Sequence, residues 1–510
     1  MFRCVRNWSL LAAALLLGGA AAQPPAATGL RFEVTVAPGM LAKPTDGRLL
    51  FVLGKVGSEG EPRRSIGDTG LTALPLLGAD VNGFAPGVVG VVDGLSEIFP
   101  IASLSKLPAG EYVAQAVFAW NPDLRLPDAP GNLYSDPHRV MLNPAEGGTV
   151  RIMLAHQEPP DHPPPDTATV KYVRLQSELL SRFHGRPIYL RAGVVLPRDF
   201  ERQPGRRFPL LVVIGGYGSR YTAAANWHDG RVSATDLPMV VLHLDGAGPY
   251  GDPYQVNSDN NGPYGDAVTQ ELIPFVEGKY RCIGRPQARF TTGTSTGGWV
   301  SLALQVFYPD FFNGCWSFAP DPVDFRAYEL INIYEDTNAY VNRFGFERPA
   351  KRNVAGDMVY NVRHECQVEN VLGRGNRWWV SGKDWCAWNA VYGPRGPDGL
   401  PKPLWHPKTG EIDRTVVDHW RKYDLRLVLT QNRQYLGPKL QGKLHVYAGD
   451  ADDYFLNNAV RLLDADLRQL KSPVIGHIQF GPMAGHGYHP INEFAEIMAR
   501  YEATKEPRTK

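Results

Sequence analysis

The sequence has little cysteine, almost no net charge and no long apolar run after its N-terminal segment. Its 510 residues include five cysteines and carry a formal net charge of +1. Balanced charge gives no electrostatic reason to expect nucleic acid or an anionic membrane as a partner. No later run is apolar enough to span a membrane. HExxH, CxxC and EF-hand patterns are missing as well, so we predict neither a metal nor an organic cofactor.

The one apolar segment, residues 1–22, has the pattern of a secretory signal peptide. Two arginines precede an apolar core over residues 10–17, and three alanines at 20–22 provide a cleavage site. Cys4 lies away from that site, which argues against a lipid anchor. We therefore expect a secreted or periplasmic protein without a membrane anchor.

Removing the signal peptide leaves four cysteines, Cys282, Cys315, Cys366 and Cys386. An even number of cysteines in an exported protein favours disulfides over metal ligands. Of the three connectivities, we favour Cys282 with Cys315, because these residues lie at or just before two strands expected to be parallel neighbours. Cys366 and Cys386, which share one insertion, would form the second bridge.

The length of the chain predicts two domains. Residues 28–156 contain short apolar runs separated by Gly, Pro and Asp clusters, a pattern typical of a small all-β sandwich. Residues 157–168 form a proline-rich linker. Residues 169–505 alternate strand-like and helix-like patterns, with an irregular stretch over 320–440. No internal repeat is present.

The most informative motif is Gly-Thr-Ser-Thr-Gly-Gly over residues 293–298. It follows the strand-like run 288–292 and leads into a helical pattern that begins at Trp299. Glycines flank the serine because any side chain there would collide with the neighbouring strand or helix. We therefore predict a nucleophile elbow that exposes Ser295, with an ordinary Gly/Ser/Thr loop as the alternative.

An acid candidate follows the strand predicted over residues 444–448. The loop after this strand carries Asp450, Asp452 and Asp453. Asp452 occupies the last place of a G-x-x-D pattern and is the preferred acid, while the other two are rivals. Three solvated loop carboxylates would be the alternative reading.

A base candidate follows a further short strand, over residues 475–480. His486 lies between two glycines after this strand, and His489 is the runner-up. The order serine, acid, histidine is the order of an α/β-hydrolase. An imidazole would accept the serine proton, and a carboxylate would fix the imidazole tautomer.

A second glycine-rich turn predicts an oxyanion hole. The apolar run 209–214 leads into Gly215, Gly216, Tyr217 and Gly218. The backbone N–H of Gly216 or Tyr217, together with that of Thr296, would stabilise the oxyanion. A plain strand-to-loop turn is the alternative.

These segments together resemble the putative esterase family of α/β-hydrolases, which includes enterochelin esterases, S-formylglutathione hydrolase-like enzymes, and feruloyl and acetyl-xylan esterases. The resemblance also covers residues 192–197 and the helix over 270–276. It implies an α/β fold with a mostly parallel sheet. Two departures are Ile214, where the family often has a histidine, and the long separation of Asp452 from Ser295, which requires a large insertion.

That insertion, residues 320–440, holds more than half of the eleven tryptophans. α/β-Hydrolases place a cap over the pocket at this position, and aromatic rings stack on sugar or aryl groups. We therefore expect a Trp-rich cap, with packing inside an irregular insertion as the equal alternative. The candidate substrate-binding residues are Trp378, Trp379, Trp385 and Trp388.

The leading interpretation is a secreted serine esterase that forms an acyl-enzyme at Ser295 and acts on a small-molecule or carbohydrate ester. A serine peptidase is the first alternative, since a β domain also precedes the hydrolase domain in some peptidases. A catalytically silent carbohydrate-binding module is the second. A binding role has no need of Ser295, Asp452 and His486, which argues against that reading.

Overall fold

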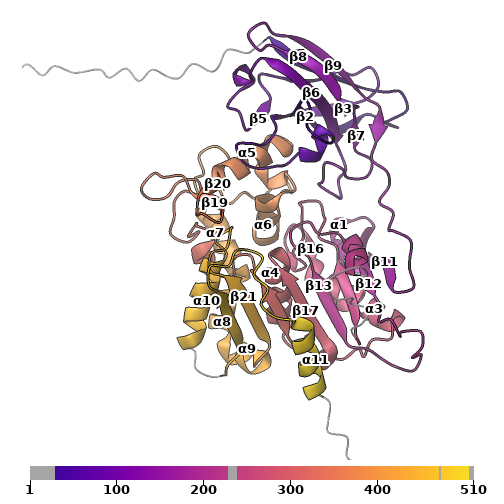
Figure 1. Cartoon of the computed structure of the whole chain (residues 1–510), viewed down its shortest axis with the longest axis vertical. Helices are drawn as coiled ribbons and strands as arrows, with labels where there is room; N and C mark the ends of the chain where they lie inside the picture. The colour runs from indigo at the N-terminus through magenta and orange to yellow at the C-terminus, as the bar shows by residue number, and fades with distance from the viewer. Residues whose placement is uncertain (1–28, 228–237, 470–472, 505–510) are drawn as a thin grey trace, which may run out of the picture.

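The structure is a computed structural model that describes residues 29–227, 238–469 and 473–504. The predicted signal peptide lies outside the described residues. Figure 1 shows a β region at one end of the molecule, an α/β domain at the other, and α5 and α6 between them. In the described ranges, no helix has the length and apolarity needed to cross a membrane.

Two sheets sharing one hydrophobic core form the N-terminal β region. In β1, alternate residues such as Phe32 and Val34 are buried while Arg31 points outward, as expected for a strand with one covered face. The three-stranded sheet contains β4 (Gly90–Asp93), β1 (Leu30–Val36) and β9 (Gly148–Leu154). The seven-stranded sheet contains β10 (His156–Gln157), β7 (Leu133–Tyr134), β6 (Gly110–Ala119), β2 (Thr45–Lys55), β3 (Leu76–Phe84), β5 (Glu97–Phe99) and, beside β6, β8 (His138–Leu142).

An eight-stranded mixed sheet forms the centre of the second domain. Its order is β11 (Val170–Ser177), β12 (Ile188–Val195), β14 (Val240–Leu244), β13 (Leu210–Ile214), β17 (Arg289–Thr294), β18 (Cys315–Phe318), β21 (Leu444–Gly449) and β22 (Gly476–Gly481). The pairs β11/β12 and β12/β14 are antiparallel, and the other neighbours are parallel. Every residue of β13 and β14 is buried, as in a sheet covered on both faces.

Helices cover both faces of this sheet. On one face, α4 (Thr296–Phe307) belongs to the main hydrophobic core together with β12, β13 and β14. On the other face, Phe494 and Ile497 of α11 (Glu493–Ala503) pack with Phe290 and Trp316. The remaining helices of this domain are α1 (Glu178–His184), α2 (Tyr264–Asp266), α3 (Ile273–Lys279) and α10 (Asn457–Gln469). A two-stranded sheet of β15 (Asn257–Ser258) and β16 (Gly262–Pro263) lies near α1.

The insertion between β18 and β21 combines short helices with long irregular segments. It contains the hairpin β19 (Pro349–Arg352) and β20 (Met358–Asn361), followed by α5 (Val362–Leu372), α6 (Asp384–Tyr392), α7 (Arg414–Trp420), α8 (Leu425–Gln431) and α9 (Arg433–Leu440). Val368 and Val371 of α5 pack against the β region beside Leu50 and Val117. Buried Arg48 donates a 2.9 Å hydrogen bond to the Val371 carbonyl, so the β region and the insertion share an interface.

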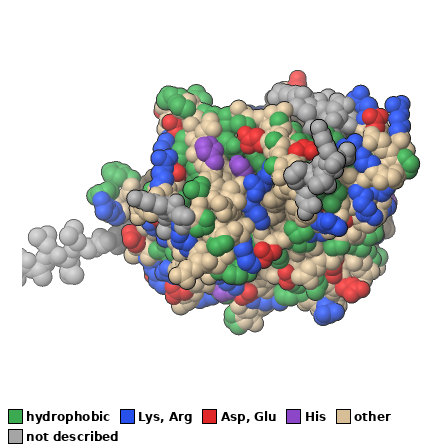
Figure 2. Space-filling model, turned by 90° about the horizontal axis from the view of Figure 1, so that it is seen from below, with side chains coloured by type: hydrophobic (Ala, Val, Ile, Leu, Met, Phe, Trp, Pro, Cys, Tyr) green, Lys and Arg blue, Asp and Glu red, His purple; other side chains and the backbone are tan. Residues whose placement is uncertain are grey.

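Opposite charges are interspersed on one face of the molecule. Figure 2 shows Lys, Arg, Asp and Glu interspersed over the face seen from the α/β end, without a broad area of one sign. This distribution agrees with the near-zero net charge.

The predicted disulfides are wrong, because Cys282, Cys315, Cys366 and Cys386 are free and buried. The backbone of Cys282 forms an isolated β-bridge with Phe208, which leads into β13, whereas Cys315 begins β18. Leu210 pairs with Arg289, and Thr291 pairs with Cys315. Cys282, beside Phe208, is therefore offset from Cys315 along the strands by about four residues, roughly 13 Å, which is beyond disulfide reach.

Cys366 and Cys386 lie on neighbouring helices but face different surroundings. Cys366 contacts Tyr340 and Trp405, while the Cys386 thiol lies beside Ser381 and Gly382. Burial raises the pKa of Cys386 to about 12, so this thiol behaves as a small apolar side chain.

Candidate active site

Ser295 lies in the turn between β17 and α4. Its backbone has φ 60° and ψ −124°, a strained conformation for a residue with a side chain. A Cβ on Gly293 would lie 2.6 Å from the Ile214 carbonyl oxygen, and one on Gly298 would lie 2.6 Å from the Phe318 carbonyl oxygen. The glycines therefore have the steric role expected of a nucleophile elbow.

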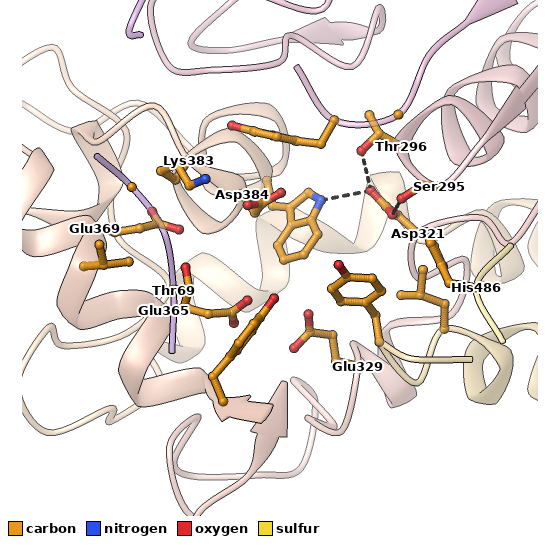
Figure 3. Close-up of a pocket in the computed structure, with 18 of the residues that line it drawn as sticks. Thr69, Ser295, Thr296, Asp321, Glu329, Glu365, Glu369, Lys383, Asp384 and His486 are labelled. Carbon is orange, nitrogen blue, oxygen red and sulfur yellow. Dashed lines mark hydrogen bonds between the residues drawn. The ribbon is translucent and has the colours of Figure 1, made fainter. Parts of the chain in front are cut away.

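A cavity of about 590 Å³ opens in front of Ser295 (Figure 3). It lies at the carboxyl ends of the parallel strands, where open α/β sheets place their ligands. The predicted residues that line it are Ser295, His486, Thr296, Gly216, Tyr217 and Trp388.

His486 and Asp452 are brought together by the loops after β22 and β21. The His486 Nδ1 atom lies 2.8 Å from Asp452 Oδ2. The Asp452 side chain is fully buried, and its Oδ1 accepts a 2.9 Å hydrogen bond from the Tyr454 N–H. The second ring nitrogen of His486 is left for other partners, as a general base requires.

The rival residues have other partners. His489 pairs with Glu493 at 2.8 Å and stacks on Phe318. Asp450 accepts a 2.6 Å hydrogen bond from the Met483 N–H. Among the described contacts, neither Asp450 nor Asp453 is hydrogen-bonded to His486.

The electrostatic surroundings favour a charged His486. Burial alone would lower the pKa of His486, but the hydrogen bond and the charge of Asp452 outweigh burial, and the pKa is raised. Asp452 therefore stabilises the imidazolium form of this ring.

Asp321 is a residue of the site that the sequence analysis missed. The Ser295 hydroxyl donates a 3.4 Å hydrogen bond to Asp321 Oδ1, and within the described structure no hydrogen bond joins Ser295 to His486. The second oxygen of Asp321 accepts hydrogen bonds from Tyr254 and, at 3.0 Å, from Thr296. Burial raises the pKa of Asp321. No motif surrounds Asp321; only its place just after β18 could have drawn attention to it.

The insertion holds the predicted oxyanion turn in place. Tyr217 donates a 2.8 Å hydrogen bond from its hydroxyl to the Gly382 carbonyl. The N–H of Ser219 closes the turn through a 3.0 Å hydrogen bond to the Gly216 carbonyl. Gly216, Tyr217 and Thr296 line the same cavity as Ser295.

Only one of the four candidate tryptophans, Trp388, lines the cavity. Its Nε1 donates hydrogen bonds to Tyr254 and, at 3.4 Å, to Asp321. Trp378 and Trp385 are fully buried against Trp405, with ring centroids 5.1 and 4.5 Å away. Trp379 is partly buried against the same core. The structure thus places Trp378, Trp379 and Trp385 in packing, because an insertion with few regular elements fills its core with aromatic rings.

The cavity also contains residues from outside the hydrolase core. Gly67, Asp68 and Thr69 of the β region line it. The insertion contributes carboxylates, namely Glu329, Glu365, Glu369 and Asp384. These residues are scattered along the sequence without a motif, so sequence reasoning had no signal for them.

Comparison with solved structures gives distant similarities. A ferulic acid esterase is 16% identical, with 66% of this chain and 95% of that chain covered and a TM-score of 0.37. An S-formylglutathione hydrolase from Agrobacterium tumefaciens is 14% identical, covering 66% of this chain and 94% of that chain, with a TM-score of 0.37. A putative dipeptidyl aminopeptidase IV from Bacteroides ovatus ATCC 8483 is 10% identical. The match covers 84% of this chain and 47% of that chain, with a TM-score of 0.38. A search of curated proteins found no match.

The sequence model of one family, described as "Putative esterase", matches residues 189–463. The matched region spans more than half of the chain and contains Ser295 and Asp452, whereas His486 follows it. The resemblance stated from the sequence is confirmed. The chain belongs to the putative esterase family of carboxylic ester hydrolases.

Proposed function

We propose that this protein hydrolyses carboxylic esters through an acyl-enzyme at Ser295, with His486 as general base and Asp452 as the acid of the triad. The observation that carries the proposal is the 2.8 Å contact between His486 and buried Asp452, in a cavity that also contains Ser295. An imidazole oriented by a carboxylate beside a serine on a strained turn is the arrangement that activates a hydroxyl.

In the first half of the reaction, the Ser295 oxygen attacks the ester carbonyl carbon while His486 Nε2 takes the hydroxyl proton. The negative charge that develops on the carbonyl oxygen is stabilised by the N–H of Thr296 and that of Gly216 or Tyr217. The bond to the alcohol then breaks, and the imidazolium gives its proton to the leaving oxygen. The products are the alcohol and an acyl group on Ser295.

In the second half, water attacks the acyl carbon and His486 takes a proton from that water. The bond to Ser295 breaks, its oxygen regains a proton from His486, and the acid leaves. Before attack, Ser295 must exchange its 3.4 Å hydrogen bond with Asp321 for one with His486. In enzymes without substrate, the hydrogen bond between serine and base is often long or missing, and it forms when the substrate binds.

We further propose that the insertion acts as a cap, because it supplies much of the cavity wall and is hydrogen-bonded to the oxyanion turn and to the acid loop. The Arg352 Nε donates a 3.0 Å hydrogen bond to the Asp452 carbonyl. We propose export of the protein on the basis of the pattern over residues 1–22.

A panel of chromogenic and polysaccharide esters, assayed with the wild type and with Ser295→Ala, tests the proposal. We expect hydrolysis of a short acetate ester by the wild type and loss to near background in Ser295→Ala. Activity that survives the substitution would contradict the proposed nucleophile.

A further inference from the structure

The cavity is acidic on the side formed by the insertion. Figure 3 shows Glu365, Glu369 and Asp384 set apart from Ser295, with Glu329 between Glu365 and His486. Lys383 is the only lysine or arginine among the residues that line the cavity. A substrate with its ester group at Ser295 would therefore extend into a strongly acidic region.

Two of these carboxylates already have donors. Glu369 accepts hydrogen bonds from the Ser381 hydroxyl at 2.8 Å and from the Trp385 N–H at 3.0 Å. Glu365 Oε2 accepts a 2.8 Å hydrogen bond from the Trp385 indole. These contacts fix the two side chains, and both residues line the cavity.

Glu329 is different, because its Oε2 has no hydrogen-bond partner in the part of the chain that the structure describes. The residue is only 2% exposed, and it lines the cavity. A buried carboxylate oxygen without a donor is costly. The cost is removed when a ligand brings a donor, above all a charged one.

We propose that Glu329, Glu365 and Asp384 form an ammonium subsite, so that the enzyme prefers esters that carry a primary ammonium group at the end of an apolar chain. This inference rests on the proposed esterase function. Val368, Trp388 and Leu456 line the same cavity and offer apolar contacts for the connecting chain. A primary ammonium has three donors, which match three carboxylates.

Proton binding by the subsite is coupled to the charge of its ligand. Burial raises the pKa of Glu329, and the charges of Glu365, Asp384, Asp321 and Asp452 raise it further. Burial also raises the pKa of Glu365, while the Trp385 hydrogen bond and the charge of Lys383 oppose this rise. A bound ammonium would favour the ionised carboxylates, so its binding should release protons.

Binding to the Ser295→Ala protein tests the subsite without any need for catalysis. The probes are n-alkylammonium ions from butyl to octyl, with n-alkanols of equal length as neutral partners, measured by titration calorimetry. We expect at least one alkylammonium to bind about tenfold or more tighter than its alkanol. Equal affinity at every length would overturn the inference.

Isosteric variants locate the effect. In Glu329→Gln and Glu365→Gln, the preference for alkylammonium should fall by about tenfold, because the charge is lost while the side-chain shape remains. The control is Glu201→Gln, an exposed carboxylate outside the cavity, which should keep the preference. A preference that persists in both cavity variants would overturn the assignment.

Turnover then connects the subsite to the proposed function. With the wild type, kcat/KM for the 4-nitrophenyl ester of an ω-amino acid should exceed that for the alkanoate ester of equal chain length, in a series of lengths. Hydrolysis of all these esters without any ammonium preference would overturn the subsite alone. Absence of hydrolysis, with ammonium binding intact, would contradict the esterase proposal and leave the subsite supported.

Discussion

The two sides of the cavity differ in how they are built. On the catalytic side, Ser295, Asp452 and His486 follow three strands of one sheet, and tight glycine turns fix their positions. On the acidic side, Glu329, Glu365 and Asp384 belong to an insertion whose shape comes from aromatic packing. Chemistry and selectivity therefore have separate structural supports here, so mutations should separate them.

The largest expected effect comes from removing the base. His486→Ala should lower kcat/KM for both neutral and cationic esters by about 10³-fold or more, because the serine proton then has no acceptor. The matched control is His489→Ala, whose side chain pairs with Glu493. Steady-state kinetics on both ester classes measures the effect. A large loss in His489→Ala with a small one in His486→Ala would reverse the assignment.

The acid should come next. Asp452→Asn should lower kcat by about 10²-fold or more while folding is retained, because the amide no longer fixes the imidazole tautomer or stabilises its charge. Asp453→Asn, one residue along, should remain near wild type. Far-ultraviolet circular dichroism checks the fold. Equal losses in the two variants would mean that the loop, and not one carboxylate, matters.

The tryptophans test the division between packing and substrate contact. Trp378→Ala should lower the free energy of unfolding by about 3–5 kcal/mol, since it empties a fully buried site. Trp388→Phe should have a smaller effect on stability but should change the ratio of kcat/KM for long and short esters by a few-fold. Denaturant unfolding and kinetics on both variants measure these effects. A changed ratio in Trp378→Ala, without one in Trp388→Phe, would contradict the division.

The last effect concerns pH and the acidic side, and it acts on stability alone. Burial raises the pKa of Glu369 from 4.5 to about 8, so the folded state keeps a proton that the unfolded state loses within this window. The free energy of unfolding should therefore fall as pH rises from 4.5 to about 8. Each such group contributes at most about 1.4 kcal/mol per pH unit.

The variant Glu369→Gln isolates this contribution. Its unfolding free energy should fall less steeply than that of the wild type across the same window, because Gln carries no titrating proton. Urea unfolding at several pH values measures both slopes. An equal slope in the two proteins would mean that Glu369 is ionised in the folded state.

The catalytic side was accessible to sequence reasoning because its signals are local. The glycines at 293, 297 and 298 predict the turn, and the loops after residues 444–448 and 475–480 carry the acid and the base. The steric reason holds in the structure, where each of these glycines approaches backbone of a neighbouring segment. Short apolar runs likewise indicated the strands of the β region and the parallel strands of the second domain. The antiparallel neighbours of these parallel strands, β11 and β12, make the sheet mixed.

The rest depends on contacts between distant segments. Asp321 and Glu329 acquire meaning only when the insertion folds over Ser295. The cysteine prediction failed because sequence shows neither the strand register that separates Cys282 from Cys315 nor the surroundings of the Cys366 and Cys386 side chains. For the tryptophans, substrate contact and core packing were equal expectations, because composition does not distinguish an aromatic core from an aromatic surface.

The most direct test of the central claim is mass spectrometry of the acyl-enzyme. The wild type is mixed with excess 4-nitrophenyl acetate and quenched in acid within milliseconds to seconds, and its peptides are mapped. The account predicts one acetyl group on Ser295, no such group in Ser295→Ala, and slower release of 4-nitrophenol in His486→Ala. Rapid hydrolysis by the wild type with an acetyl group on another residue, or continued turnover in Ser295→Ala, would contradict it.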